Sequence, residues 1–379
     1  MSALPTGLCL MIELQDILKE HIKDYIRGVY LTEAQIKAIN AISSCRTARL
    51  GAHKDLCSEC GFEKISYNSC RNRHCPKCQA LAKEDWIDRQ KQNLIDCKYF
   101  HVVFTIPAGL GSIFLQNQKL MYTLFFKAVS ETLLELCADK KYLDAKPGIT
   151  AILHTWGQTL NYHPHIHCIV TGGGLTKAGA WKAGRKKFFI PVKVLSKKFR
   201  GKLLYLLRQE KLLFHGKLEP LNETAHYSEF LKKLYEAEWV VYCKPPFGDP
   251  QKVIDYLGRY THRVAISNNR LLSLQDGFIS FSYRDYSDGN KQKTMKLQVD
   301  EFIRRFLTHV LPLCFRKIRH YGLFAPKDKG YRIALCRLLT RTLIDFVRET
   351  THERLVRILG YGFNLCPLCK VGYMSRASP

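Results

Sequence analysis

The chain has 379 residues, which is enough for two or three domains, and 46% of them are hydrophobic, as in ordinary folded proteins. Its 59 Lys and Arg against 33 Asp and Glu give a net charge of +26, which favours nucleic acid over an anionic membrane as the partner. The sequence lacks the run of about 18 apolar residues that a transmembrane helix needs, and "GLCLMI" is too short for a signal peptide. We therefore expect a cytoplasmic, nucleoid-associated protein that does not bind a membrane.

The N-terminal part of the chain is predicted to be helical. Apolar residues recur every three to four positions within residues 12–45, which predicts two helices. Thr32 is the expected N-cap of the second helix, and Gln35 completes a capping box. A cysteine-rich segment, residues 57–78, and the helical pattern "LAKEDWIDRQKQNLI" follow. We group these elements as a first unit, residues 1–92, a helical region that carries a zinc-binding knuckle.

An α+β domain with an antiparallel sheet is predicted for residues 93–268. The stretches "KYFHVVFTIP", "GITAILHTWG" and "HPHIHCIVTGG" indicate strands, and "LQNQKLMYTLFFKAVSETLLELC" is typical of a long helix. "EFLKKLYEAEWVVYCK" predicts a helix that runs into a strand, and "DPQKVIDYLGRYTHRVAI" predicts a helix with Pro250 at its first turn. The rest, residues 269–379, is expected to be a basic mixed region with a hairpin turn at Asp276 and Gly277 and two helices.

Closely spaced cysteines indicate a metal site in the knuckle. Two C-x2-C pairs are separated by fourteen residues, and four thiolates complete a tetrahedral zinc site that leaves no open position for catalysis. The knuckle is therefore predicted to bind one structural Zn²⁺ ion and to help dock DNA. Cys70 and His74 could replace members of this set or contribute to a second zinc, and a distant pair, Cys366 and Cys369, stays unassigned. The predicted ligands are Cys57, Cys60, Cys75 and Cys78.

Histidines alternate along one predicted strand. In "YHPHIHCIV", His163, His165 and His167 lie two residues apart, so a strand would place them on one face. A divalent ion held by imidazoles and one further ligand keeps positions for a phosphate oxygen, as a Lewis acid acting on a phosphodiester requires. The alternative is that these histidines only pack in the core or lie at the surface.

Two tyrosines share one face of a predicted helix. In "DYLGRYTHR", Tyr256 and Tyr260 are four residues apart, and a phenol oxygen is a competent nucleophile once its proton is removed. Arg259 and Arg263 lie beside them and are predicted to contact DNA phosphates. The alternative is that this tyrosine pair only packs the helix against the core.

A basic stretch is a second candidate DNA-binding segment. Residues 177–217 contain thirteen Lys and Arg, including Lys186 and Lys187, and one acidic residue. Aromatic residues such as Phe199 and Tyr205 are interleaved with them, which is typical of surfaces that follow a nucleic acid backbone and stack on bases. The alternative is a solvated basic helix, and the charge of the whole chain favours DNA contact.

Together, "SCRNRHCPKCQ", "YHPHIHCIVTGGG" and "YLGRYTHRVAISNNRL" resemble the rolling-circle HUH transposases of bacterial insertion sequences, of the IS91 type. The resemblance runs from about residue 10 to about residue 370. It implies that His165 and His167 bind Mg²⁺ or Mn²⁺, that the four knuckle cysteines hold Zn²⁺, and that Tyr256 and Tyr260 are the nucleophiles of the two-tyrosine subgroup. One tyrosine would attack single-stranded DNA at the element's end, giving a 5′-phosphotyrosine and a free 3′-hydroxyl, and the other would cleave or resolve a second strand.

The resemblance leaves the third metal ligand and some details of function open. Gln158 is our first expectation for that ligand, with His154, His163 and His262 as alternatives. Because the sequence has no G-x-x-x-x-G-K-[ST] loop, host replication or a host helicase is expected to unwind the DNA. Two other functions remain: a rolling-circle replication initiator or relaxase with the same chemistry, and a zinc-dependent DNA-binding protein without catalysis.

Overall fold

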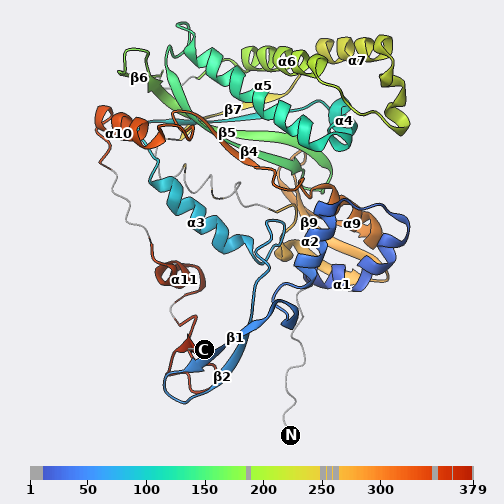
Figure 1. Ribbon diagram of the computed structural model, residues 1–379, viewed down its shortest axis with the longest axis vertical. Coiled ribbons are helices and arrows are strands. Elements are labelled where there is room, and N and C mark those ends of the chain that lie inside the picture. The colour runs from blue at the N-terminus through green and yellow to red at the C-terminus, as the bar shows by residue number, and fades with distance from the viewer. Residues whose placement is uncertain are drawn as a thin grey trace.

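The fold is α+β with antiparallel sheets, as the sequence predicts (Figure 1). In the described part of the chain the strands form three sheets, one large and two small. None of the helices there is long and apolar enough to cross a membrane. The computed structural model describes residues 12–184, 189–247, 253, 258, 264–343, 349–360 and 362–377.

Helices and strands are interspersed along the chain. The helices are α1 (Leu14–Tyr25), α2 (Glu33–Ser43), α3 (Gln79–Lys91), α4 (Gly111–Gln116), α5 (Gln118–Ala138), α6 (Val192–Gln209), α7 (Thr224–Glu236), α9 (Val299–Thr308), α10 (Lys329–Leu339) and α11 (Thr351–Leu359). The strands are β1 (Ala52–Cys57), β2 (Glu63–Tyr67), β3 (Tyr99–Thr105), β4 (Lys146–Trp156), β5 (Tyr162–Leu175), β6 (Trp181–Ala183), β7 (Val241–Phe247), β8 (Leu271–Gln275), β9 (Phe278–Asp285), β10 (Lys291–Gln298), β11 (Ile318–Gly322) and β12 (Met374–Arg376).

The large sheet has the strand order β11-β4-β5-β3-β7, with β6 paired to β5. Helices α5 and α6 cover one of its faces, and α3 and α10 lie on the other side (Figure 1). Because side chains alternate along a strand, Ile166, Cys168 and Val170 of β5 enter the apolar core under α5 and α6. His165, His167 and Ile169 occupy the alternate positions of β5 and therefore point to the opposite face.

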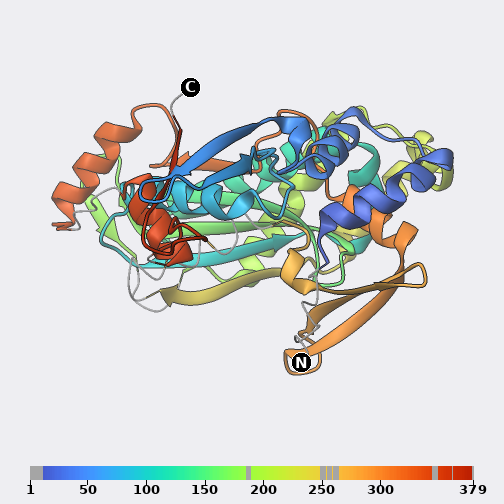
Figure 2. The same cartoon turned by 90° about the horizontal axis from the view of Figure 1, so that it is seen from below.

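A second core joins the two ends of the chain. Helices α1 and α2 pack on the β8-β9-β10 sheet and α9, and Figure 2 shows these elements on the same side of the molecule. The β8-β9 hairpin turns at Asp276 and Gly277 with φ of 51° and 75°, so the predicted two-residue turn is confirmed. His309, just after α9, bonds Thr155 of β4 and donates to the Leu160 carbonyl, which ties this core to the large sheet.

The third sheet, β12-β1-β2, pairs the end of the chain with the knuckle, and β11 lies in the large sheet. The predicted unit 269–379 therefore contributes strands to all three sheets, so the boundaries at 92 and 268 do not separate folding units. The sequence missed this because pairing between strands hundreds of residues apart leaves no local signal.

Local signals near the helix ends were more informative. Thr32 caps α2, where its side chain accepts from the Gln35 N–H and the reciprocal bond is present, so the predicted capping box is confirmed. The long helix predicted over residues 115–137 is wrong at its start, because α4 ends at Gln116 and α5 begins at Gln118. The amide of Asn117 between them exchanges hydrogen bonds with the backbone of Leu213.

A buried ion pair docks α11 on α3. The Arg354 guanidinium donates twice to the Asp88 carboxylate, at 2.8 and 3.2 Å, and both side chains are buried. Arg357 adds an ion pair to Glu84 of α3 at 3.0 Å. A buried ion pair gives little net stability compared with apolar packing, but losing one partner leaves the other charge buried.

We expect Asp88→Ala to undock α11, because it strips Arg354 of its closest carboxylate. The local cost should be about 3 kcal/mol, measured as roughly 100-fold faster hydrogen exchange in α11. The matched control is Glu33→Ala, which breaks an exposed pair with Lys37 and should cost less than about 0.5 kcal/mol. Equal exchange rates in the two variants would contradict this role of Asp88.

Candidate active site and cysteine clusters

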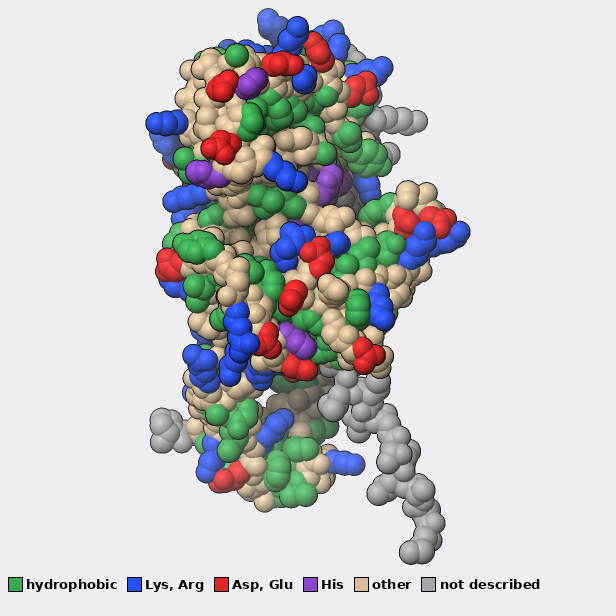
Figure 3. All heavy atoms as spheres, turned by 90° about the vertical axis from the view of Figure 1, so that its right-hand side faces the viewer, with side chains coloured by type: hydrophobic (Ala, Val, Ile, Leu, Met, Phe, Trp, Pro, Cys, Tyr) green, Lys and Arg blue, Asp and Glu red, His purple; other side chains and the backbone are tan. Residues whose placement is uncertain are grey.

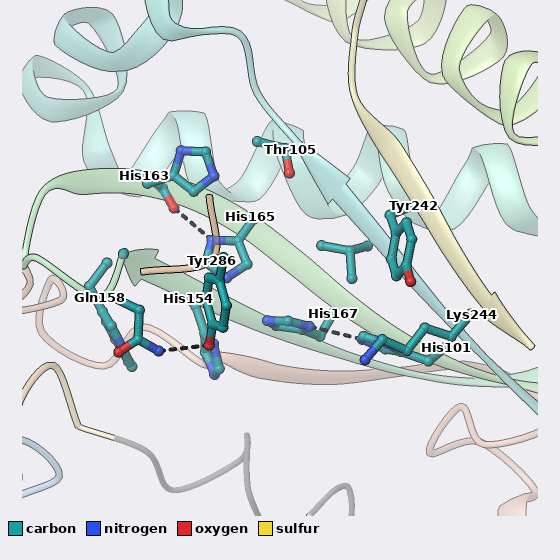
Figure 4. Close-up of a pocket in the computed structure, with 13 residues that line it drawn as sticks. His101, Thr105, His154, Gln158, His163, His165, His167, Tyr242, Lys244 and Tyr286 are labelled. Atoms are coloured by element: carbon teal, nitrogen blue, oxygen red, sulfur yellow. Dashed lines mark hydrogen bonds between the residues drawn. The ribbon is translucent and has the colours of Figure 1, made fainter. Parts of the chain in front are cut away.

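A cavity of about 680 Å³ opens on the face of the large sheet opposite α5 and α6. Strands β3, β4, β5 and β7 supply its floor, the turn after β4 adds Gly157 and Gln158, and Tyr286 closes one side from the small β8-β9-β10 sheet (Figure 4). The large sheet and the turn after β9 therefore line one cavity together. The lining residues are His101, Val103, Thr105, His154, Trp156, Gly157, Gln158, His163, His165, His167, Tyr242, Lys244 and Tyr286.

Three histidines converge in this cavity with their nitrogens within 4.8 Å of one another. His165 and His167 come from β5, as the alternation along the strand predicts, and His154 comes from β4, where it lies opposite His165. Their rings stand at steep angles to each other, with centroids 4.7 to 5.5 Å apart (Figure 4). Rings at these angles aim their nitrogens at a common point, which suits one divalent cation. We call these three residues the histidine triad.

A hydrogen bond fixes which nitrogen of His165 carries a proton, and a second hydrogen bond joins His167 to His101. His165 Nδ1 lies 2.7 Å from the His163 carbonyl, which can only accept, so the proton is on Nδ1 and the lone pair is on Nε2. His167 Nδ1 lies 2.9 Å from His101 Nε2. Metal-binding histidines commonly donate their second ring nitrogen to a carbonyl or another acceptor in this way.

His101 determines the state of His167. Burial, with the charge of Lys244 nearby, lowers the pKa of His101 to about 3, so its ring is neutral at physiological pH. A neutral His101 accepts from His167 Nδ1–H when its own proton is on Nδ1, and His167 then directs the Nε2 lone pair to the ion. The sequence analysis missed His101, although its alternate position with Val103 and Thr105 on a predicted strand places it on this face.

The third member of the triad differs from our first expectation. Gln158 lines the cavity, but its amide nitrogen donates to the Tyr286 hydroxyl at 2.8 Å. His154 instead is buried, stacks on Trp156 and joins His165 and His167. The geometry therefore favours His154 over Gln158. The sequence could not rank them, because only the β4–β5 register places His154 opposite His165.

Positive charge reaches the same cavity from β7. Tyr242 and Lys244 pair with Val103 and His101 across the β3–β7 ladder, so they share the face of the triad. A lysine here complements the charge of a phosphate. The sequence analysis did not single out these residues, because a tyrosine and a lysine on a strand carry no motif.

Several predicted site residues lie outside the described part of the chain: Tyr256, Arg259, Tyr260, His262, Arg263, Lys186 and Lys187. Five residues of the predicted tyrosine helix, 249–266, are described: Val253 and Gly258 are helical, whereas residues 264–266 are not, so the helix ends earlier than predicted. Val253 is fully buried with Ile152 and Ile169, which share the sheet face of the triad. A Cβ on Gly258 would lie 2.4 Å from Ile87 Cδ1, so Gly258 lies close to α3 and a side chain there would displace Ile87.

The cysteines form two separate four-thiolate clusters. One combines Cys75 and Cys78 with Cys45, at the end of α2, and Cys70. The other combines Cys57 and Cys60 with the C-terminal pair. The predicted single site of Cys57, Cys60, Cys75 and Cys78 is therefore wrong in its grouping, because the fold carries the two pairs apart. A lone cysteine such as Cys45 gives no spacing signal.

Within the first cluster the sulfurs are spaced as zinc requires. Cys78 Sγ lies 3.5 Å from Cys45 Sγ and 3.6 Å from Cys70 Sγ, close to the edge of about 3.8 Å in a tetrahedral Zn–S₄ site. Cys70, expected as a possible addition, is thus a full member. His74 is not, because its Nε2 accepts from the Leu311 N–H, and burial lowers its pKa to about 3.

The basic stretch is only partly a free surface. On α6, Phe199 is fully buried in the main core, so the prediction that it stacks on bases is wrong, whereas Tyr205 is exposed. Lys198 and Lys202 pair with Glu135 of α5. Figure 3 shows Lys and Arg side chains along the length of one face of the molecule, with fewer Asp and Glu between them.

Comparisons with known proteins agree with this arrangement. A family model described as "Putative transposase" matches residues 148–330, and one described as "Transposase zinc-binding domain" matches residues 17–106. "Putative transposase y4qJ" of Sinorhizobium fredii is 44% identical over 96% of this chain and 94% of its own length. "Transposase for insertion sequence element IS801" of Pseudomonas savastanoi pv. phaseolicola is 29% identical over 79% of this chain and 72% of its own length.

We expect His101→Ala to weaken divalent metal binding at the histidine triad by about 10- to 100-fold, because His167 loses the partner of its Nδ1. The measurement is a Mn²⁺ titration of the folded variant by calorimetry. The control is His226→Ala, which removes an exposed histidine of α7 that does not line the cavity. It should leave the affinity unchanged. An unchanged affinity in His101→Ala would show that His101 does not position His167.

Proposed function

Because the chain belongs to the IS91 family of transposases, we propose that it nicks and rejoins single-stranded DNA at the ends of an insertion sequence, in rolling-circle transposition. The proposed intermediate is a 5′-phosphotyrosine formed by Tyr256 or Tyr260. The observation that carries this proposal is the histidine triad, which lies in an open cavity together with a lysine.

The donor set fits a divalent ion that also binds phosphate. Three neutral imidazoles are softer ligands than Mg²⁺ prefers, so we expect Mn²⁺ to support the reaction better than Mg²⁺. His154, His165 and His167 would hold such an ion, and the open cavity would leave it accessible to phosphate oxygens. Such an ion would stabilise the charge that builds up on the phosphodiester during cleavage.

The protein residues supply the nucleophile and hold the DNA. A tyrosine hydroxyl loses its proton as its Oη attacks phosphorus, the bond from phosphorus to the 3′ oxygen breaks, and the released 3′ oxygen takes up a proton to become the 3′-hydroxyl. Lys244 brings positive charge to the cavity that would receive the phosphate. Religation is the reverse reaction and needs no nucleotide cofactor, because the phosphotyrosine keeps the energy of the phosphodiester.

The described part of the predicted tyrosine helix supports this arrangement. Val253 packs against Ile152 and Ile169, which lie two residues from His154 and His167 on the same strands. Gly258 is two residues from each tyrosine in the sequence and contacts α3 closely. Val253 and Gly258 thus lie near the sheet face that carries the triad and near α3, and this supports the proposal that a nucleophile of this helix shares a phosphate with the ion.

The alternative enzyme, a replication initiator or relaxase, would use the same chemistry. The names of the relatives favour the transposase, since both are described as transposases and one is assigned to an insertion sequence. A zinc-dependent DNA-binding protein without catalysis would not need three histidines whose nitrogens converge in an open cavity.

The direct test is a gel assay for a covalent protein–DNA adduct on labelled single-stranded DNA that carries the element's ends. Wild type should form the adduct with Mn²⁺, more slowly with Mg²⁺, and not with EDTA. The Tyr256→Phe/Tyr260→Phe double variant should form none, and His165→Ala/His167→Ala should react about 10³-fold more slowly. Each single tyrosine variant shows which phenol acts first.

The matched control is Tyr235→Phe, which removes an exposed phenol on α7 and should react like wild type. Tight DNA binding without any adduct in wild type would favour the non-catalytic alternative. An adduct that persists in the double tyrosine variant would place the nucleophile elsewhere.

A further inference from the structure

Four cysteines from opposite ends of the chain meet in the second cluster. Cys57 Sγ lies 3.6 Å from Cys369 Sγ, and Cys60 Sγ lies 3.7 Å from Cys366 Sγ, although more than 300 residues separate the members of each pair. All four sulfurs are within 4.8 Å of one another. The match to the family model of the transposase zinc-binding domain ends at residue 106. It therefore does not include Cys366 and Cys369.

We propose that these four cysteines bind a second Zn²⁺ ion, which clasps the C-terminus onto the N-terminal knuckle. The sulfur separations match the edge of about 3.8 Å in a tetrahedral Zn–S₄ site. They are far longer than the bond of about 2.05 Å in a disulfide. Because four thiolates fill the coordination sphere, the ion is structural and not catalytic. We call this site the clasp.

The backbone around each pair is arranged as a metal-binding turn. The Cys57 N–H donates to the Phe62 carbonyl at 3.0 Å, and the Cys366 N–H donates to the Gly372 carbonyl at 2.8 Å, so both pairs lie in similar closed turns. Backbone N–H groups also point at the sulfurs, from Glu59 to Cys57 Sγ and from Gly372 to Cys369 Sγ. Such donors stabilise thiolates, which are the form that binds zinc.

Gly372 shows how closely the two turns approach. A Cβ at this position would lie 2.4 Å from Cys57 Sγ and 2.8 Å from Glu59 Cγ, which no side chain tolerates without displacement. Because Gly372 has no side chain, Cys57 Sγ can lie this close to the turn that carries Cys366 and Cys369. The β1–β12 ladder fixes the same register, since Cys57 lies opposite Met374.

The sheet around the clasp has almost no apolar core. Among the described residues of 52–67 and 362–377, only Cys57, Cys366 and Gly372 are buried. Ile65 and Tyr67 of β2 and Tyr373 before β12 are exposed. So small a sheet cannot be stable through hydrophobic burial alone, and a metal ion is a usual substitute. Binding energy at the clasp is therefore also folding energy for β12 and the turn before it.

The clasp and the Asp88–Arg354 pair together hold the last part of the chain at two points. Arg354 docks α11 on α3, and the clasp fixes the segment beyond α11 to β1 (Figure 1). Helix α3 begins at Cys78 of the first cluster and contacts Gly258 of the predicted tyrosine helix. Both clusters thus stabilise the surroundings of α3. This inference does not depend on the proposed nicking reaction.

The test is the zinc content of the purified full-length protein, measured by inductively coupled plasma mass spectrometry. All variants carry His165→Ala/His167→Ala, so that the histidine triad does not contribute zinc. We expect two Zn²⁺ ions per chain in this background and one after adding Cys366→Ser/Cys369→Ser. Cys314→Ser, an exposed cysteine outside both clusters, is the matched control and should keep two.

If the double serine variant folds poorly, hydrogen exchange in the parent protein provides a second test. Mild chelation of the parent protein should release one ion and accelerate exchange in β1 and β12 while the central sheet stays protected. One zinc per chain in the parent protein would overturn the proposal. So would two zinc ions retained after Cys366→Ser/Cys369→Ser, or chelation that leaves exchange in β12 unchanged.

Discussion

The antiparallel pairing of β4 and β5 is the constraint on which the rest of the structure depends. It places His154 opposite His165, and a shift of one residue would send the histidines of β5 to the face covered by α5 and α6. The register is secured because Ile166, Cys168 and Val170 alternate with the histidines and are buried in the main core. The same apolar residues that stabilise the domain therefore also hold the triad, so the stability of the sheet and the geometry of the site cannot vary independently.

The two faces of this sheet differ in composition and in function. One is apolar and buried under α5 and α6, and the other carries imidazoles, a lysine and a tyrosine around an open cavity. His101 is buried beside this cavity. Burial lowers its pKa, so its ring stays neutral, and it orients His167 through their hydrogen bond. Tyr286, in the turn after β9, bonds Gln158 beside the cavity, and His309, just after α9, bonds Thr155 of β4, so the shape of the cavity depends on how these elements join the large sheet.

The two cysteine clusters lie in different surroundings, one inside an apolar core and one in a sheet that has few apolar residues to bury. The first cluster lies between α2 and the start of α3, in the second core. The second lies in a sheet with hardly any buried side chain. With zinc bound at the proposed clasp, metal–thiolate bonds would stabilise this small sheet without a large apolar surface.

The sequence alone determined the α+β class, the N-terminal helices with their Thr32 cap, the hairpin at Asp276, and the shared face of His165 and His167, because each follows from local periodicity or turn chemistry. Its motifs also indicated the transposase family. Only the tertiary structure decided that His154 completes the triad, that His101 orients it, and that the knuckle cysteines divide into two clusters with Cys45 and the C-terminal pair. These features arise from contacts between residues far apart in the chain. Strand register and sulfur–sulfur proximity are set by how the cores pack, and no local pattern records them.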